Sequence, residues 1–82
     1  MKTIVTKVVA DTPEKLGKAI RLHRTIRRLT QQQLADLSGV TRPAIVRIEA
    51  GAPATRISSV LAVMRVLGMQ LPTYFVGEDE RW

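Results

Sequence analysis

The chain has 82 residues, with 13 lysines and arginines against 7 aspartates and glutamates, and it contains no cysteine. Its length predicts one small domain whose modest core would gain from dimerisation, and the lack of cysteine excludes disulfides and thiolate sites. The net charge of +6 favours a polyanionic partner, most simply nucleic acid, although an anionic membrane surface or an acidic protein would also attract it.

The first predicted elements are a short strand and a helix. Thr3–Val9 is rich in β-branched residues, which favours a strand. Asp11 or Thr12 can then cap a helix that has Pro13 at its first position. We expect this helix to run from about residue 13 to residue 28, with one face formed by Leu16, Ala19, Ile20 and His23.

Two short helices joined by a tight turn are predicted next. Thr30 and Gln33 have the spacing of a capping box, and Leu34, Ala35 and Leu37 follow as an apolar side. Gly39 allows the positive φ of a sharp turn. Thr41 caps the second of these helices, Ile45 and Ile48 point inward, and Gly51 begins a loop. Such a pair is typical of a helix-turn-helix, which lays its second helix in the major groove of DNA.

The last predicted helix starts after a cap at Thr55 and runs to about Leu67, with Gly68 as its stop. One apolar stripe contains Ile57, Val60, Leu61, Met64 and Leu67, and a second contains Val63 and Val66. A helix that is apolar on nearly all sides must be buried on more than one side, so we expect a second copy of the chain to cover part of it.

The chain then enters a second predicted strand, Met69–Val76, which Pro72 weakens. Because an isolated two-stranded ribbon is marginal in water, we expect this strand to pair with Thr3–Val9, either within one chain or across a dimer. The organisation expected is an N-terminal strand (1–10), a helical domain (11–68), and a strand followed by a tail (69–82).

Three segments carry a resemblance to a known family. Residues 29–35 (LTQQQLA), 38–41 (SGVT) and 45–51 (IVRIEAG) closely resemble the Cro/C1-type (XRE) helix-turn-helix family, and the resemblance covers about residues 14–68. It implies a mainly α fold, a lambda-repressor-like bundle of four to five helices, to which the residue pattern adds the short terminal strands, expected at a dimer interface. It also implies binding to double-stranded operator DNA as a two-fold homodimer.

The resemblance assigns roles to individual residues. The positions that face base edges are Arg42, Pro43, Val46 and Arg47. A guanidinium can donate two hydrogen bonds to guanine, whereas Pro43 and Val46 can only touch a thymine methyl group or sense shape. The phosphate-facing positions are Gln31, Thr41 and Ala44. Ala44 departs from the family's usual polar residue and loses a hydroxyl contact, and Pro43 removes an amide. Arg27 and Arg28 are either further phosphate contacts or a solvated basic surface.

The resemblance also pairs Arg24 with Glu49 as a partly buried ion pair that holds the recognition helix to the scaffold. At the other end of the chain, we expect the dimer interface to be formed by Val63, Val66, Met69, Leu71 and Phe75. The combination of a helical core, a short strand and a tail resembles the HipB-type antitoxins within the family. That resemblance implies autorepression of an operon and a complex with a HipA-type kinase toxin.

Three hypotheses follow: a repressor that is also an antitoxin, a free-standing phage or chromosomal repressor, and a protein-bridging module on the same fold. An enzyme is not expected, because the sequence offers no phosphate-binding glycine loop, no metal cluster and little room for a substrate pocket. We expect no cofactor, no metal and no membrane association, and therefore a cytoplasmic protein. Aromatic residues occur only near the end of the chain, which favours duplex over single-stranded nucleic acid.

Overall fold

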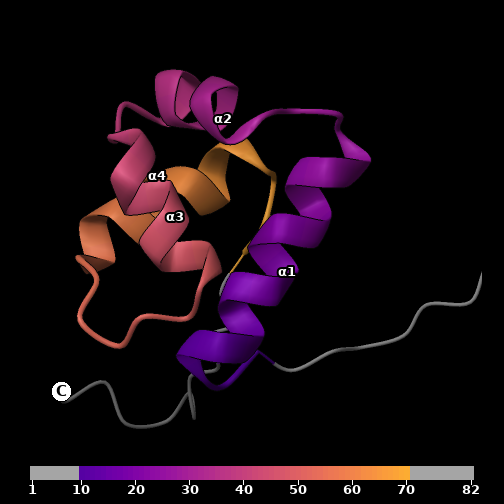
Figure 1. Ribbon diagram of the computed structural model, residues 1–82. Helices are drawn as coiled ribbons and strands as arrows, with labels where there is room; N and C mark the ends of the chain where they lie inside the picture. The colour runs from indigo at the N-terminus through magenta and orange to yellow at the C-terminus, as the bar shows by residue number, and fades with distance from the viewer. Residues whose placement is uncertain (1–9, 71–82) are drawn as a thin grey trace, which may run out of the picture.

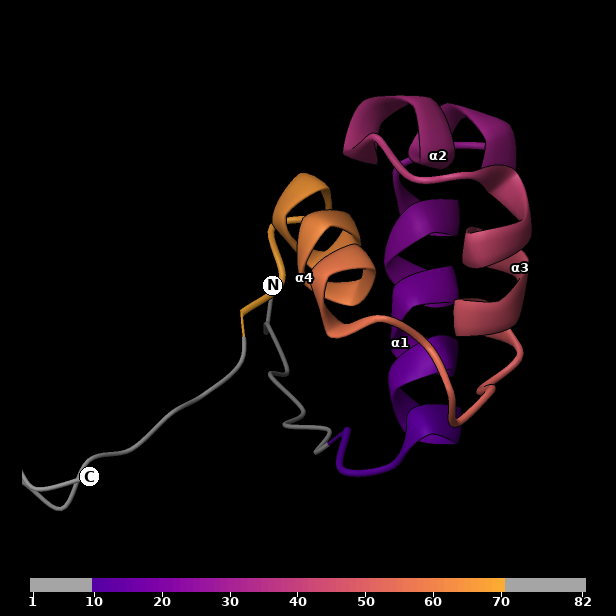
Figure 2. The ribbon, with the colours of Figure 1, turned by 90° about the vertical axis from the view of Figure 1, so that its left-hand side faces the viewer.

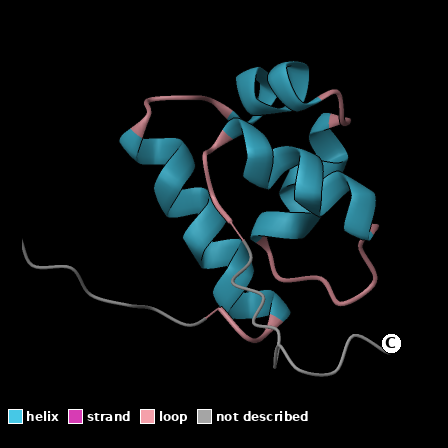
Figure 3. Cartoon of the chain, turned by 180° about the vertical axis from the view of Figure 1, so that it is seen from behind, coloured by secondary structure: helices cyan, strands magenta, loops and turns pink. Residues whose placement is uncertain are grey.

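The computed structural model describes residues 10–70, which form four α-helices joined by loops (Figure 1). The helices are α1 (Pro13–Ile26), α2 (Gln31–Ser38), α3 (Arg42–Glu49) and α4 (Ile57–Val66). Within residues 10–70 the view from behind contains only helices and loops (Figure 3). The strand expected at Thr3–Val9 lies outside the described residues, as does all of Met69–Val76 except Met69 and Gln70, which are not in a strand.

Three of these helices begin at a threonine whose hydroxyl accepts a backbone N–H of the first turn. Thr12 Oγ1 accepts from the Lys15 amide at 3.1 Å, so Thr12 caps α1 and Asp11 instead pairs with the Lys15 side chain. Thr30 and Gln33 form the expected capping box, with bonds of 3.0 and 2.8 Å, and Thr41 caps α3 as expected. Each such cap stabilises a helix by about 1 kcal/mol.

The cap predicted at Thr55 is wrong. The N-cap of α4 is Arg56, and no side chain bonds to the first turn of this helix. The loop that leaves α3 brings Thr55 in one residue too early for capping. Thr55 instead lies half-buried beside Ile48, between the hollows on either side of this loop. Tertiary contact therefore overrides a favourable local signal at this position.

Each of the four helices is followed within two residues by a residue with positive φ. Three of these residues are glycines, Gly39, Gly51 and Gly68, and the fourth is Arg28 with a φ of 56°. Helix α1 ends at Ile26, two residues before the predicted end, because the chain turns at Arg28. The amides of Arg28 and Leu29 donate to the carbonyls of Thr25 and Arg24 at 3.0 and 3.1 Å, which is the bonding of a Schellman motif.

The helices enclose one hydrophobic core. Helix α1 packs against α3, and α2 packs against both α3 and α4 (Figure 2). Gly17 permits the close approach of α1 to α3, because a Cβ there would lie 2.4 Å from the carbonyl oxygen of Ile48. Leu37, expected on the apolar side of α2, is exposed. The buried apolar residues are Ile20, Leu34, Ala35, Ile45, Ile48, Val60, Val63, Met64 and Leu67.

The two stripes predicted on α4 are divided differently in the structure. Ile57 and Leu61, expected to pack with the core, are 66% and 41% exposed, whereas Val63, expected to face a second chain, is 0% exposed. The reason is that α2 covers the side of α4 that carries Val63. Val63 therefore has no surface to offer a partner, while Val66 and Met69 stay half-buried at the edge of the core.

Candidate DNA-binding surface

Helix α3 has one face in the core and one face in solvent. Ile45 and Ile48 are 0% and 3% exposed, and they fasten the helix to the bundle. All four positions expected to face base edges are exposed, and their spacing puts them on one side of the helix: Arg42, Pro43, Val46 and Arg47. The structure therefore presents a short helix whose outer side carries two arginines and two apolar side chains.

The residues expected at phosphates surround the first turns of α2 and α3. Gln31 is half-buried at the start of α2, and its Nε2 donates to Glu49 Oε1 at 3.2 Å. Thr41 is exposed, and its hydroxyl accepts from the amide of Ala44 at 3.3 Å. Ala44 itself is half-buried. These residues flank the exposed side of α3, as the resemblance implies.

Arg27 and Arg28 lie apart from this group. The Arg27 guanidinium donates to the carbonyl oxygen of His23 at 3.2 Å, and it lies beside Gly68 at the end of α4. Arg28 is exposed in the turn that ends α1. Because the Arg27 side chain covers the C-terminus of its own helix, where a cation is favoured, its position has a structural explanation. The structure does not bring Arg27 to the exposed side of α3.

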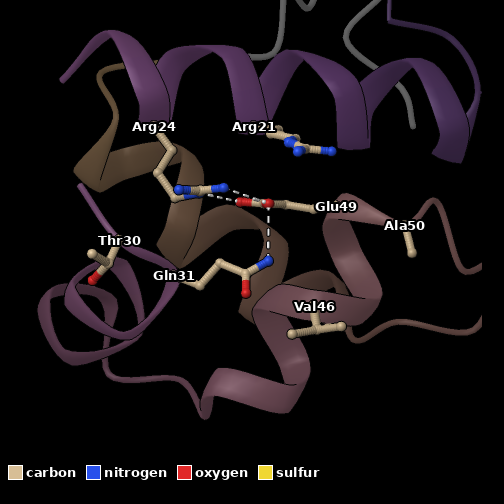
Figure 4. A pocket seen from close by; sticks show the side chains of 7 residues that line it. All are labelled: Arg21, Arg24, Thr30, Gln31, Val46, Glu49 and Ala50. Atoms are coloured by element: carbon tan, nitrogen blue, oxygen red, sulfur yellow. Dashed lines mark hydrogen bonds and ion pairs between the residues drawn. The ribbon is translucent and has the colours of Figure 1, made fainter. Parts of the chain in front are cut away.

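The expected ion pair between Arg24 and Glu49 is present and has two hydrogen bonds (Figure 4). Arg24 Nε donates to Glu49 Oε2 at 2.6 Å, Nη2 donates to Oε1 at 3.0 Å, and Nη1 donates to the carbonyl of Leu29 at 2.8 Å. The two side chains are only 12% and 5% exposed. The hydrogen bonds that Arg24 donates to Glu49 raise the pKa of Arg24, burial opposes this effect, and the negative charge of Glu49 adds to it.

Glu49 thus joins three helices. It lies at the end of α3 and accepts hydrogen bonds from Arg24 of α1 and Gln31 of α2. Paired planar groups of this kind are geometrically specific, because guanidinium and carboxylate match only in one orientation. The network therefore sets the position of α3 relative to the start of α2. The residues expected at base edges lie on α3, and Gln31, expected at a phosphate, lies at the start of α2.

Two hollows lie on either side of α3. One, of about 510 Å³, is lined by residues of α1, the start of α2 and the end of α3, including Arg21, Gln31 and Val46 (Figure 4). The other, of about 490 Å³, lies beside the start of α4 and is lined by Thr41, Arg47 and Arg56 among others. Sequence reasoning did not select Arg21 or Arg56 as site residues. Their cationic side chains were visible in the sequence, but their nearness to α3 was not.

Comparison with known proteins identifies the family. Residues 14–73 match the helix-turn-helix family HTH_3, which is most of the chain and includes α2 and α3. The chain belongs to this family. It is also 37% identical over 70 residues to an uncharacterized HTH-type transcriptional regulator, y4mF, of Sinorhizobium fredii (strain NBRC 101917 / NGR234), covering 85% of this chain and 92% of that protein. The chain is accordingly a helix-turn-helix transcriptional regulator of the XRE type.

Solved structures share the fold. A chain of a HipA–HipB–O2–O3 complex superposes with a TM-score of 0.72 at 21% identity, covering 88% of this chain and 99% of that chain. A HipB–O4 20mer complex gives the same values. The restriction-modification controller protein C.AhdI of Aeromonas hydrophila gives a TM-score of 0.64 at 29% identity, covering 71% of this chain and 88% of that one. The bundle is therefore of the type found in HipB and C.AhdI.

Residues 10–70 show neither of two other kinds of site. No helix in this range is long and apolar enough to cross a membrane. Nor do three or more histidine, aspartate or glutamate side chains gather there in a way that could hold a metal ion.

Proposed function

We propose that this regulator is a sequence-specific repressor that inserts α3 into the major groove of double-stranded DNA. The observation that carries the proposal is the division of α3 into an anchored inner face, Ile45 and Ile48, and an exposed outer face with Arg42 and Arg47. Each arginine can donate two hydrogen bonds to O6 and N7 of a guanine, which discriminates against other bases by about 1–3 kcal/mol. Pro43 and Val46 supply apolar contacts to thymine methyl groups.

The backbone contacts in this proposal come from the flanks of α3. Gln31 at the start of α2 and Thr41 at the start of α3 hydrogen-bond to phosphate oxygens and thereby set the depth of α3 in the groove. Ala44 and Pro43 contribute no hydrogen-bond donor from their side chains. Anchoring therefore depends on the first turn of α2 and on cations near α3, and one of these is Arg56, which lines the same hollow as Thr41.

The proposed binding unit is a two-fold dimer. The apolar surface that α4 leaves exposed, Ile57 and Leu61, supports it, together with half-buried Val66 and Met69. Leu71 and Phe75, also expected at this interface, lie outside the described residues. A symmetric dimer carries a formal charge of 2 × (+6) = +12, which favours association with DNA. Such a dimer reads a palindrome whose half-sites are about one helical turn apart.

We further propose that the repressor is the antitoxin of a toxin–antitoxin operon, with a HipA-type kinase as its partner. Support comes from the fold shared with HipB, because the similarity covers nearly the whole of the matched chain. One of the matched structures is a complex that also contains HipA. The alternative, a free-standing regulator without a toxin, is favoured by C.AhdI, a restriction-modification controller with a higher sequence identity of 29%. Expression with the neighbouring genes, followed by affinity capture, separates the two. A kinase-like protein that co-purifies supports the antitoxin, and capture of the regulator alone rejects it.

Selection of bound sequences from random duplex DNA tests the repressor proposal. The wild type should enrich one palindrome. Arg42→Ala and Arg47→Ala should each relax base preference at one position per half-site, whereas Gln31→Ala should weaken binding to all sequences similarly. Recovery of the same palindrome with the same preferences from both arginine variants would show that α3 is not the reading helix. Absence of any enriched sequence from the wild type would reject the repressor and favour a protein-bridging module.

A further inference from the structure

Arg21 is a cation at the edge of the hollow between α1, α2 and α3. It is exposed, and it lines this hollow together with Arg24 and Glu49 (Figure 4). Among residues 10–70, no hydrogen bond or ion pair joins Arg21 to another side chain, whereas Arg24, one turn further along α1, uses three of its nitrogens. A cation beside an acidic residue would be expected to pair with it, so the free Arg21 needs an explanation.

The explanation lies in the Glu49 carboxylate, which already accepts three hydrogen bonds and has its charge paired with Arg24. Both of its oxygens accept hydrogen bonds from Arg24, and Oε1 also accepts one from Gln31. The charged residues that line the hollow are Arg21, Arg24 and Glu49, so their formal sum is +1 + 1 − 1 = +1. The hollow therefore carries one uncompensated positive charge, which Arg21 presents to solvent. One phosphodiester group carries the matching single negative charge.

The polar groups at the rim suit the same ligand. Gln31 points its amide nitrogen at Glu49, and this nitrogen has a second proton to donate. Val46, on the outer side of α3, forms the opposite wall. A DNA strand that passes α3 on this side would bring a backbone phosphate over the hollow. Arginine is the side chain best suited to such a group, because its planar fork can donate two parallel hydrogen bonds to phosphate oxygens.

We propose that Arg21 is a DNA-backbone contact that holds one phosphate over this hollow together with Gln31. This inference rests on the proposed function, because it requires duplex DNA on the outer side of α3. It assigns to α1 a direct part in DNA binding beyond its packing against α3. It also connects the phosphate to the Arg24–Glu49–Gln31 network. The position of α3 and the position of the DNA phosphate are therefore coupled through Gln31.

The salt dependence of binding tests the proposal. The operator affinity of the full chain is measured between 50 and 200 mM salt for the wild type, Arg21→Ala, Arg21→Lys and Lys18→Ala. Lys18 is the matched control, because it is exposed on the same helix, loses the same charge and does not line the hollow. One lost phosphate contact lowers the slope of log affinity against log salt by about 0.9, so the wild type should lose about 3.5-fold more affinity than Arg21→Ala over this range.

Arg21→Lys should keep most of the wild-type slope, because it retains the charge, and Lys18→Ala should match the wild type. Thermal unfolding of all four proteins checks that the substitutions leave the fold unchanged. Equal slopes for Arg21→Ala and Lys18→Ala would overturn the proposal. That result is separate from failure of the proposed function, which appears as a wild type that does not prefer its operator over random DNA at any salt concentration.

Discussion

Replacing Arg24 with methionine should strongly destabilise the protein. Methionine keeps much of the length of the arginine stem but removes three hydrogen bonds, two to Glu49 and one to the carbonyl of Leu29. Glu49 would remain 5% exposed as a carboxylate with only the Gln31 amide as partner. The cost therefore comes mainly from an uncompensated buried charge and not from the lost attraction itself.

Loss of one partner from a buried pair costs about 3–5 kcal/mol. Because Arg24 is 12% exposed and water can approach one side of the pair, we expect a value near the lower limit, about 3 kcal/mol. At about 4–8 °C per kcal/mol for a domain of this size, the melting temperature should fall by about 12–24 °C. Urea unfolding followed by circular dichroism measures the free energy of unfolding. All variants are compared at one protein concentration, since association with a second chain would add to stability.

Two further variants make the reasoning refutable. Arg24→Met combined with Glu49→Met removes both charges and should recover part of the loss, because no buried charge remains. Lys15→Met breaks the other ion pair, with Asp11, whose side chains are 56% and 60% exposed, and should change stability far less. A loss below about 1 kcal/mol for Arg24→Met, or a double variant no more stable than Arg24→Met, would refute the buried-pair argument.

Two other predictions concern α1. Gly17→Ala should destabilise the protein by about 1–3 kcal/mol, because the alanine Cβ would lie 2.4 Å from the backbone oxygen of Ile48 and push α3 away. If Gly17→Ala melts at the same temperature as the wild type, the close approach of α1 to α3 is contradicted. The hydrogen bond and charge of Lys15 lower the pKa of Asp11, so this carboxylate favours folding above its unfolded pKa and loses that contribution as the pH falls. In Lys15→Met, NMR titration should find the pKa of Asp11 raised toward the ordinary value of an aspartate, and an unchanged value would exclude Lys15 as the cause.

Local chemistry made three of the four helix starts and three of the four helix ends predictable, the exceptions being the start of α4 and the end of α1. A threonine hydroxyl reaches the first-turn amide two or three residues ahead, so the caps at Thr30 and Thr41 depend on adjacent residues only. Glycine tolerates a positive φ at little cost, so Gly39, Gly51 and Gly68 mark helix ends. Arg28 gave no such signal, because a residue with a Cβ adopts this conformation only where other contacts compensate. Here Leu29 packs on the core and its carbonyl binds Arg24.

Periodicity was a weaker guide for α4. Its sequence is apolar on nearly all sides, so the helical repeat alone could not say which residues face the core. The position of α2 decided this question by covering Val63 and leaving Ile57 and Leu61 in solvent. The sequence was equally unable to place Thr55. Its side chain is suitable for a cap, but it lies one residue before Arg56, which is the N-cap of α4.

For the candidate site, the resemblance named four positions of α3 as base-facing, and helical spacing places these four residues on one side of the helix. The resemblance implied the pair of Arg24 and Glu49, but the third partner, Gln31, and the placement of Arg21 were decided only by tertiary structure. Arg24 and Glu49 are 25 residues apart, and they meet because Gly17 lets α1 approach α3 closely. The two Glu49 oxygens then accept three hydrogen bonds from Arg24 and Gln31, and Arg21 remains an exposed cation where the proposed DNA strand would pass.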